Sequence, residues 1–156
     1  MLRRFLQTDD DVSATVMRLI LGIVFIPHGA QKVLGLFGGY GFSGTIQGFG
    51  KMGIPSWLTV LVMACEFGGA ILLILGLLTR LAALGIGAVM VGAILLVHGK
   101  VGFFMNWSGK QPGEGIEYHL IALAVVVALI IKGGGAFSVD RALTRDSGGT
   151  APLPAP

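Results

Sequence analysis

Long apolar runs constrain this chain more than any other feature. A helix needs about 20 apolar residues to cross a hydrocarbon core about 30 Å thick. The runs cover Val12–Phe37, Trp57–Leu78, Leu81–Val97 and Tyr118–Ile131. The first two are long enough, the third is at the short end of the range, and the fourth needs Glu117 or Lys132 to lie at the interface. The pattern predicts an all-α integral membrane protein, an antiparallel bundle of four transmembrane helices.

The composition supports a lipid bilayer as the surrounding medium. Only 12% of the residues are charged, about half the usual share of about 25%. Cys65 is the single cysteine, which argues against a disulfide framework and against a membrane enzyme that uses a CxxC pair. No basic stripe with interleaved aromatic residues suggests nucleic acid. The first run is long and contains Arg18, which disfavours a cleaved secretory signal.

Lysine and arginine predict the orientation, because basic residues stay on the cytoplasmic side. With four spans, one side holds six: Arg3, Arg4, Arg80, Lys132, Arg141 and Arg145. The other side holds three: Lys51, Lys100 and Lys110. We therefore expect both termini in the cytoplasm.

The sequence predicts one transmembrane domain over residues 1–137, followed by a disordered tail over residues 138–156. The tail is rich in proline, glycine and alanine. Asp9 to Asp11 suit the N-terminal cap of the first helix, and Pro55 suits the entry to the second. The glycine-rich stretch from Phe37 to Pro55 and the stretch from Gly99 to Gly115 are predicted to be outer loops.

Polar residues inside the apolar runs give the strongest functional signal. A charge within the bilayer is costly and calls for a partner. His28, Gln31 and Lys32 lie within one helical turn of each other, and Glu66 falls at the depth of His28 on the next helix. The predicted polar cluster in the outer half comprises His28, Gln31, Lys32, Glu66, His98, Glu117 and His119. Arg18 lies nearer the inner side and is expected to be a structural charge.

Simpler interpretations of these residues remain open. Lys32 and His98 could sit at the headgroups, and Glu117 could lie at the positive end of a helix dipole. Glu66 could form a structural pair with Arg18 or with His28. Glu117 and His119 are two residues apart, so they point nearly opposite ways on a helix. No histidine or glutamate spacing typical of a metal site is present, so no metal is expected.

Two stretches resemble the DoxX family of small four-helix membrane proteins. They are "RLILGIVFIPHGAQKVLGLFG" and "ACEFGGAILLILGLLTRLAALGIG", and the loop "GFSGTIQGFGKMGIP" between them also fits. The resemblance implies a bacterial inner-membrane protein associated with oxidoreductases, since the family is named after subunits of thiosulfate:quinone oxidoreductase. The positions that match the family are Arg18, His28, Gly29, Lys32, Glu66 and Arg80.

The leading hypothesis is a membrane subunit of a redox complex that contacts quinone. His28 and Glu66 would bind or protonate the quinone oxygens, and Lys32 would stabilise developing negative charge. The alternatives are a non-enzymatic scaffold or small-solute transport module, and a purely structural partner protein in which buried charges fix the helix register. A protein partner is expected, whereas the sequence names no substrate, reaction or oligomeric state.

Overall fold

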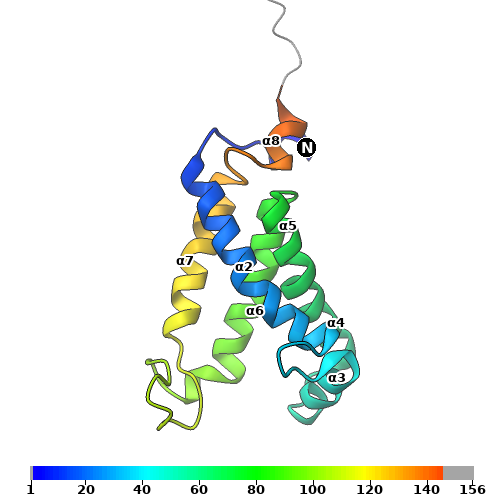
Figure 1. Cartoon of the computed structure of the whole chain (residues 1–156), viewed down its shortest axis with the longest axis vertical. Helices are drawn as coiled ribbons and strands as arrows, with labels where there is room; N and C mark the ends of the chain where they lie inside the picture. The colour runs from blue at the N-terminus through cyan, green and yellow to red at the C-terminus, as the bar shows by residue number, and fades with distance from the viewer. Residues whose placement is uncertain (1, 146–156) are drawn as a thin grey trace, which may run out of the picture.

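The structure is a computed structural model that describes residues 2–145, and it contains helices and loops but no strand within that range (Figure 1). The long helical segments run between two ends of the molecule. Both α1 and α8 lie at one end, here called the termini end, and α3 lies at the other, here called the loop end. The helices are α1 Leu2–Leu6, α2 Val12–Leu34, α3 Gly41–Lys51, α4 Ser56–Met63, η1 Ala64–Gly68, α5 Gly69–Leu75, α6 Thr79–Leu96, η2 His98–Lys100, α7 Glu117–Lys132 and α8 Val139–Thr144.

Three helices are long and apolar enough to cross a membrane: Val12–Leu34, Ser56–Leu75 and Thr79–Leu96. The second of these is continuous through α4, η1 and α5. An all-α membrane architecture is therefore confirmed. Helix α7 packs along α6 and also touches α2, but it has only 16 residues, so the fourth span remains a prediction.

Apolar side chains form both the core and the outer surface. Phe25 of α2, Leu73 of α5, Ile86 of α6 and Leu129 of α7 are buried together in one cluster. Other apolar side chains of the same helices are exposed, among them Ile20, Ile23, Leu84 and Ile131. A water-soluble bundle would carry polar residues on that outer face, whereas helices in lipid can be apolar on both faces.

Arg18 holds the termini end together. Its side chain, in a residue that is 2% exposed, donates hydrogen bonds to the carbonyl oxygens of Leu73, Ile74, Gly134 and Phe137 at distances of 2.6 to 2.9 Å. These bonds tie α2 to the end of α5 and to the segment after α7. The planar guanidinium can bind four carbonyl groups at once because it presents five donors in a fixed geometry.

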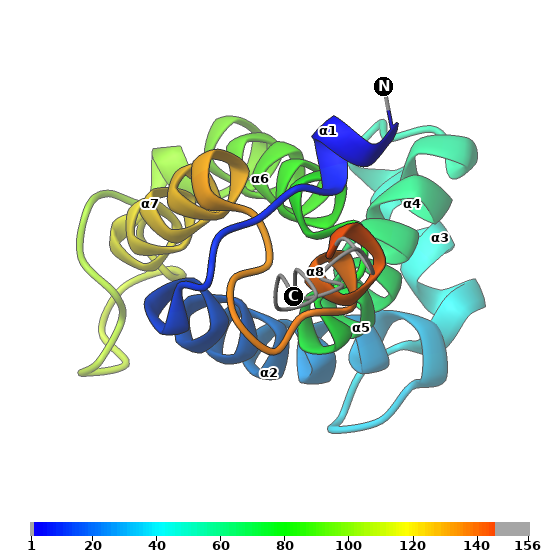
Figure 2. The same ribbon diagram turned by 90° about the horizontal axis from the view of Figure 1, so that it is seen from above.

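The predicted start of a disordered tail at residue 138 is wrong. Ser138 caps α8 by accepting a hydrogen bond from the Arg141 amide, and α8 covers the termini end (Figure 2). Asp140 is buried and accepts hydrogen bonds from the amides of Leu78 and Thr79, which caps the start of α6. Two polar residues therefore order a segment whose composition resembles a linker. Residues 146–156 lie outside the described part.

The stretch from Phe37 to Pro55 is also not the plain loop that was predicted, because it contains α3. Five glycines from Gly38 to Gly48 argued against a helix, since each glycine inside one costs about 1 kcal/mol relative to alanine. Tertiary contacts stabilise α3 instead: it packs against α2, and the Thr45 hydroxyl donates to the carbonyl oxygen of Lys32 at 3.0 Å.

The expected helix boundaries are otherwise confirmed. Asp11 is the N-cap of α2 and accepts from the amides of Ser13 and Ala14. Pro55 immediately precedes α4. Helix α2 continues through Pro27 to Leu34, so the polar residues after Pro27 belong to a helix and not to a frayed end.

Candidate functional site

A cavity of about 750 Å³ opens toward the loop end. In Figure 1, α2 and α4 diverge there from α6 and α7, and residues of all four helices and of η1 line the cavity. Its walls are mainly apolar, with Phe25 and Met90 buried deep in the wall. The polar and thiol side chains on its wall are His28, Lys32, Cys65, Glu66, His98, Tyr118 and His119, with Glu114 at the rim.

The π-helical turn η1 brings Glu66 to this cavity. Single π turns are rare within α-helices and are frequent at functional sites, because the wider turn changes which side chains face inward. Glycine at position 29 lets α2 approach this turn closely, since a Cβ there would lie 2.6 Å from Cα of Phe67. The close approach places the next turn of α2, which carries Lys32, beside Glu66.

Lys32 and Glu66 form an ion pair. Nζ of Lys32 lies 2.6 Å from Oε2 of Glu66, and the two side chains are 24% and 6% exposed. At this distance between opposite charges that are shielded from most water, charge attraction holds the two groups together. The partner of Glu66 is therefore neither Arg18, which binds carbonyl groups at the termini end, nor His28, the two partners that the sequence suggested.

His28 faces the same cavity and meets its neighbours through ring contacts. The ring centroids lie 6.1 Å from Phe25 and 6.5 Å from Tyr118. The described contacts of His28 include no hydrogen bond to Glu66, so a water-bridged contact between these two side chains stays a prediction.

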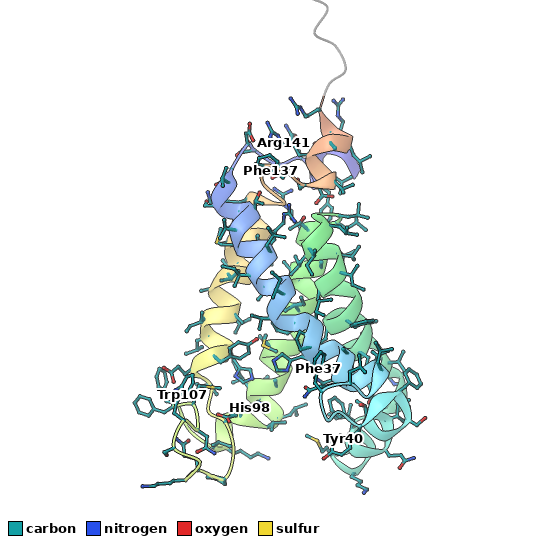
Figure 3. All side chains as sticks on the ribbon, in the orientation of Figure 1. Phe37, Tyr40, His98, Trp107, Phe137 and Arg141 are labelled. Atoms are coloured by element: carbon teal, nitrogen blue, oxygen red, sulfur yellow. The ribbon has the colours of Figure 1, made fainter. Side chains whose placement is uncertain are left out.

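A second polar group on the wall consists of His98, Tyr118 and His119. The imidazole centroids of His98 and His119 are 4.3 Å apart. Nδ1 of His98 lies 2.8 Å from the carbonyl oxygen of Glu114, and because a carbonyl only accepts, Nδ1 donates, which leaves Nε2 as the acceptor in the neutral ring. Figure 3 places His98 at the loop end.

Two buried atoms in this second group have no hydrogen-bond partner among the described residues. They are Nδ1 of His119, in a residue that is 5% exposed, and the hydroxyl of Tyr118. A buried polar atom without a partner costs about 1–3 kcal/mol, so natural proteins contain few of them. Both residues line the cavity, so water or a bound molecule there can reach these atoms.

Three of the predicted site residues do not line this cavity. Gln31 donates from Nε2 to the carbonyl oxygen of Phe37 and lines a separate pocket. Glu117 accepts a hydrogen bond from the Met105 amide, while its neighbour His119 lines the cavity, as their spacing indicated. Arg18 is at the opposite end.

Three polar or thiol residues that line the cavity were not among the predicted site residues: Cys65, Glu114 and Tyr118. Tyr118 stands between two residues that were singled out, and a tyrosine opening an apolar run was a usable signal. Cys65 precedes Glu66, but two neighbouring residues of an ordinary helix point about 100° apart. Both nevertheless line this wide cavity, as the neighbours Tyr118 and His119 also do on α7.

The DoxX family profile matches residues 13–99, from α2 to η2. The chain belongs to the DoxX family. "Inner membrane protein YqjF" of Escherichia coli is 31% identical over 136 residues, which cover 87% of this chain and 95% of the relative. "Putative oxidoreductase CatD" of Bacillus subtilis is 29% identical over 130 residues, or 83% of this chain and 86% of the relative. No solved structure is detectably similar.

A third DoxX relative, "Uncharacterized membrane protein Rv3486" of Mycobacterium tuberculosis, is 30% identical over 148 residues, which cover 91% of this chain and 88% of the relative. The matched region of the DoxX protein contains all three membrane-capable helices and both partners of the Lys32–Glu66 pair. His119 and Tyr118 lie beyond it.

Proposed function

We propose that this DoxX protein is a membrane subunit of a redox complex and binds a quinone in the cavity. The observation that carries the proposal is the combination of apolar walls with buried, unpartnered polar atoms at His119 and Tyr118. Ligand sites are commonly apolar cavities of about 300–1,000 Å³ with a few polar groups that fix orientation. The name of the Bacillus subtilis relative supports a redox role.

The polar side chains suit the two oxidation states of such a ring. A quinone, when bound, supplies chemistry with two electrons and two protons. The Tyr118 hydroxyl and the Lys32 ammonium are donors for carbonyl oxygens. Glu66, Nδ1 of His119 and Nε2 of His98 are acceptors for hydroxyl groups. Lys32 stabilises negative charge on a reacting oxygen, and His28 and Glu66 hold protons beside it.

The membrane placement belongs to the same proposal. Helix α7 serves as the fourth span, with Lys132 extending its side chain to the interface. The termini end faces the cytoplasm, and the protein resides in the inner membrane, as the name of the Escherichia coli relative states for that protein. A protein partner delivers or takes the electrons.

Protection of Cys65 tests quinone binding directly. The thiol lines the cavity and is the single cysteine of the chain, so a small uncharged maleimide reports on access to the site. Decylubiquinone has a fully substituted ring and does not add to thiols. At ten times its dissociation constant it should slow the labelling by about tenfold, because only unoccupied sites react.

Two glycine variants sharpen this test. Gly92 lines the cavity and has open space where a Cβ would lie, so Gly92→Leu should fill the site and abolish the protection. Gly68 has equally open space but does not line the cavity, so Gly68→Leu is the matched control and should keep it. Equal labelling of the wild type with and without decylubiquinone would refute quinone binding.

A further inference from the structure

A second pocket, of about 380 Å³, lies between the end of α2 and α3. We call it the vestibule, and its lining includes Gln31, Lys32, Tyr40, Thr45, Gly48 and Phe49. Lys32 lines both the vestibule and the apolar cavity. Phe49 and Met52 also line both hollows, so the two hollows adjoin along a strip that includes Lys32 but not Glu66, which lines the cavity alone.

The vestibule differs from the cavity mainly in position. Its lining surface is also largely apolar, but four glycines leave backbone groups uncovered beside the side chains of Gln31, Lys32 and Thr45. Tyr40 on its rim is 87% exposed and lies at the loop end (Figure 3). The cavity wall consists mainly of apolar side chains from membrane-capable helices.

Specific contacts shape the vestibule. Gln31 donates to the carbonyl oxygen of Phe37 at 3.1 Å, and Thr45 donates to that of Lys32 at 3.0 Å. A Cβ on Gly39 would overlap the backbone of Gln31, so only glycine permits this turn of the chain. These contacts hold the segment before α3 against the last turn of α2 and leave the hollow between them.

We propose that the vestibule is the water-side entrance for protons to Glu66, with Lys32 as the relay. The Lys32 ammonium gives a proton to the Glu66 carboxylate, and water in the vestibule returns a proton to the Lys32 amine. The exposure of the two side chains, 24% for Lys32 and 6% for Glu66, fits this order. The proposal rests on the proposed function for the use of the proton, but not for the route of water.

The other ionisable groups around Glu66 lie on the cavity side of the pair. They are His28 on α2, Cys65 on η1, His98 after α6, Glu114 before α7, and Tyr118 and His119 on α7. None of these residues lines the vestibule. Lys32 is thus the one ionisable side chain, among the described residues, that reaches both hollows.

Two carbodiimides of different polarity separate the two routes to Glu66. A carbodiimide adds to a protonated carboxyl group, and a neighbouring amine then displaces a urea, leaving an amide. Glu66 and Lys32 should therefore become cross-linked with the net loss of one water. A cationic, water-soluble carbodiimide enters from the vestibule, whereas dicyclohexylcarbodiimide enters from the apolar cavity. Mass spectrometry of the digested protein measures the modified peptides in each case.

Matched glycine variants of α3 test the vestibule. Gly48 lines it and has open space where a Cβ would lie, whereas Gly50 has the same open space but does not line it. Gly48→Leu should lower cross-linking by the water-soluble reagent roughly tenfold, because a filled pocket holds no water. Gly50→Leu should leave it unchanged. Both substitutions favour the helix, and an unchanged size-exclusion profile confirms folding.

A variant that fills the cavity, Gly92→Leu, tests the second route to Glu66. Gly92→Leu should lower modification by dicyclohexylcarbodiimide and leave the water-soluble reagent unaffected. Water-soluble cross-linking that Gly48→Leu does not reduce, or that Gly92→Leu blocks, would overturn the proposal. If decylubiquinone fails to protect Cys65 while this pattern holds, the quinone assignment fails and the vestibule stands.

Discussion

Glu66 needs its ion pair with Lys32 more than Lys32 needs it, because the two side chains are exposed to water to different degrees. The Lys32 side chain is about a quarter exposed and lines the vestibule as well as the cavity. Its ammonium keeps access to water through a long flexible stem. The carboxylate of Glu66 lies on the π turn of a membrane-capable helix and is almost fully buried. Removing the Lys32 side chain therefore leaves a buried carboxylate unpaired, whereas removing the Glu66 side chain leaves a partly hydrated ammonium group unpaired.

The free energy of unfolding should reflect this asymmetry. Lys32→Met should destabilise the protein by about 3–5 kcal/mol, the usual cost of leaving a buried charge unpaired. Glu66→Gln should cost less, and the double variant should recover most of the loss. Denaturant titrations in one detergent give the double-mutant cycle. His28→Gln with Glu66→Gln is the comparison cycle and should show a smaller coupling than Lys32→Met with Glu66→Gln, because His28 and Glu66 are expected to interact only through water; a larger coupling there would reassign the partner.

Residue spacing predicted that polar groups gather, but not which of them pair. Counting the rise of straight α-helices matched Glu66 with His28 in depth. The contact between Gly29 and Phe67, the residues that follow them, agrees with that depth. The ion pair nevertheless forms with Lys32, one turn further along α2, because its long side chain reaches Glu66 on η1 and because Gly29 allows a close approach of the two helices. Both depend on tertiary packing. The ring contact between His98 and His119 could not be predicted from the sequence either, since it joins segments that flank a loop.

At the scale of elements, the contact between α2 and η1 determines the geometry of the site. Gly29 and Phe67 are in backbone-to-backbone contact there. Gly29→Ala must push the helices apart, and such overpacking typically costs about 1–3 kcal/mol. Gly68→Ala has open space and should be neutral or stabilising by up to about 1 kcal/mol. Unfolding titrations compare the two variants, and equal stabilities would show that the close approach is unimportant.

A second contact between elements joins the start of α2 to the end of α7. Asp11 caps α2 and also forms an ion pair with Lys132. The Lys132 ammonium, followed by the hydrogen bond from Ser13, holds the pKa of the Asp11 carboxyl well below its usual range. A carboxyl group with a lowered pKa stabilises the folded state above its unfolded pKa, about 3.9, and loses that contribution as the pH falls further.

Stability measured against pH should therefore separate wild type from Asp11→Asn. The wild type should be more stable from pH 5 to 7, and the difference should shrink as the pH falls below about 4. Lys132→Met removes the largest cause of the pKa shift and should reduce the same pH dependence. Thermal unfolding in detergent over this range measures it. A difference that stays constant down to pH 2 would contradict this role of the pair.

Elements with strong periodic signals were predicted well, and those that depend on long-range contacts were not. The three membrane-capable helices follow from apolar length alone. Helix α3 needed its packing on α2, and α8 needed Asp140, whose partners lie more than 60 residues away at the start of α6. Glycine-rich and linker-like compositions hide such contacts, because they describe only the local preferences of the chain.

At the scale of the whole molecule, the two ends are built differently. The termini end is closed by side chains that bind backbone groups: Arg18 across α2, α5 and the segment after α7, and Arg80 across α6, α7 and the carbonyl oxygens of Phe5 and Gln7. The loop end contains both the cavity and the vestibule. Both hollows therefore lie at the same end of the molecule.

The orientation of the protein in the membrane therefore decides from which side the proposed protons come. The distribution of the basic residues predicts that orientation. The structure places Arg80, Lys132 and Arg141 at the termini end through their contacts with Phe5, Asp11 and Asp10, whereas Lys51 ends α3 at the loop end. Because basic residues stay in the cytoplasm, the loop end should face the periplasm. Alkaline phosphatase is active only in the periplasm, so it should be inactive when fused to either terminus and active when inserted after Lys110. A fluorescent protein fused to the C-terminus should fluoresce. An active phosphatase at the C-terminus would reverse the orientation and place both hollows on the cytoplasmic side.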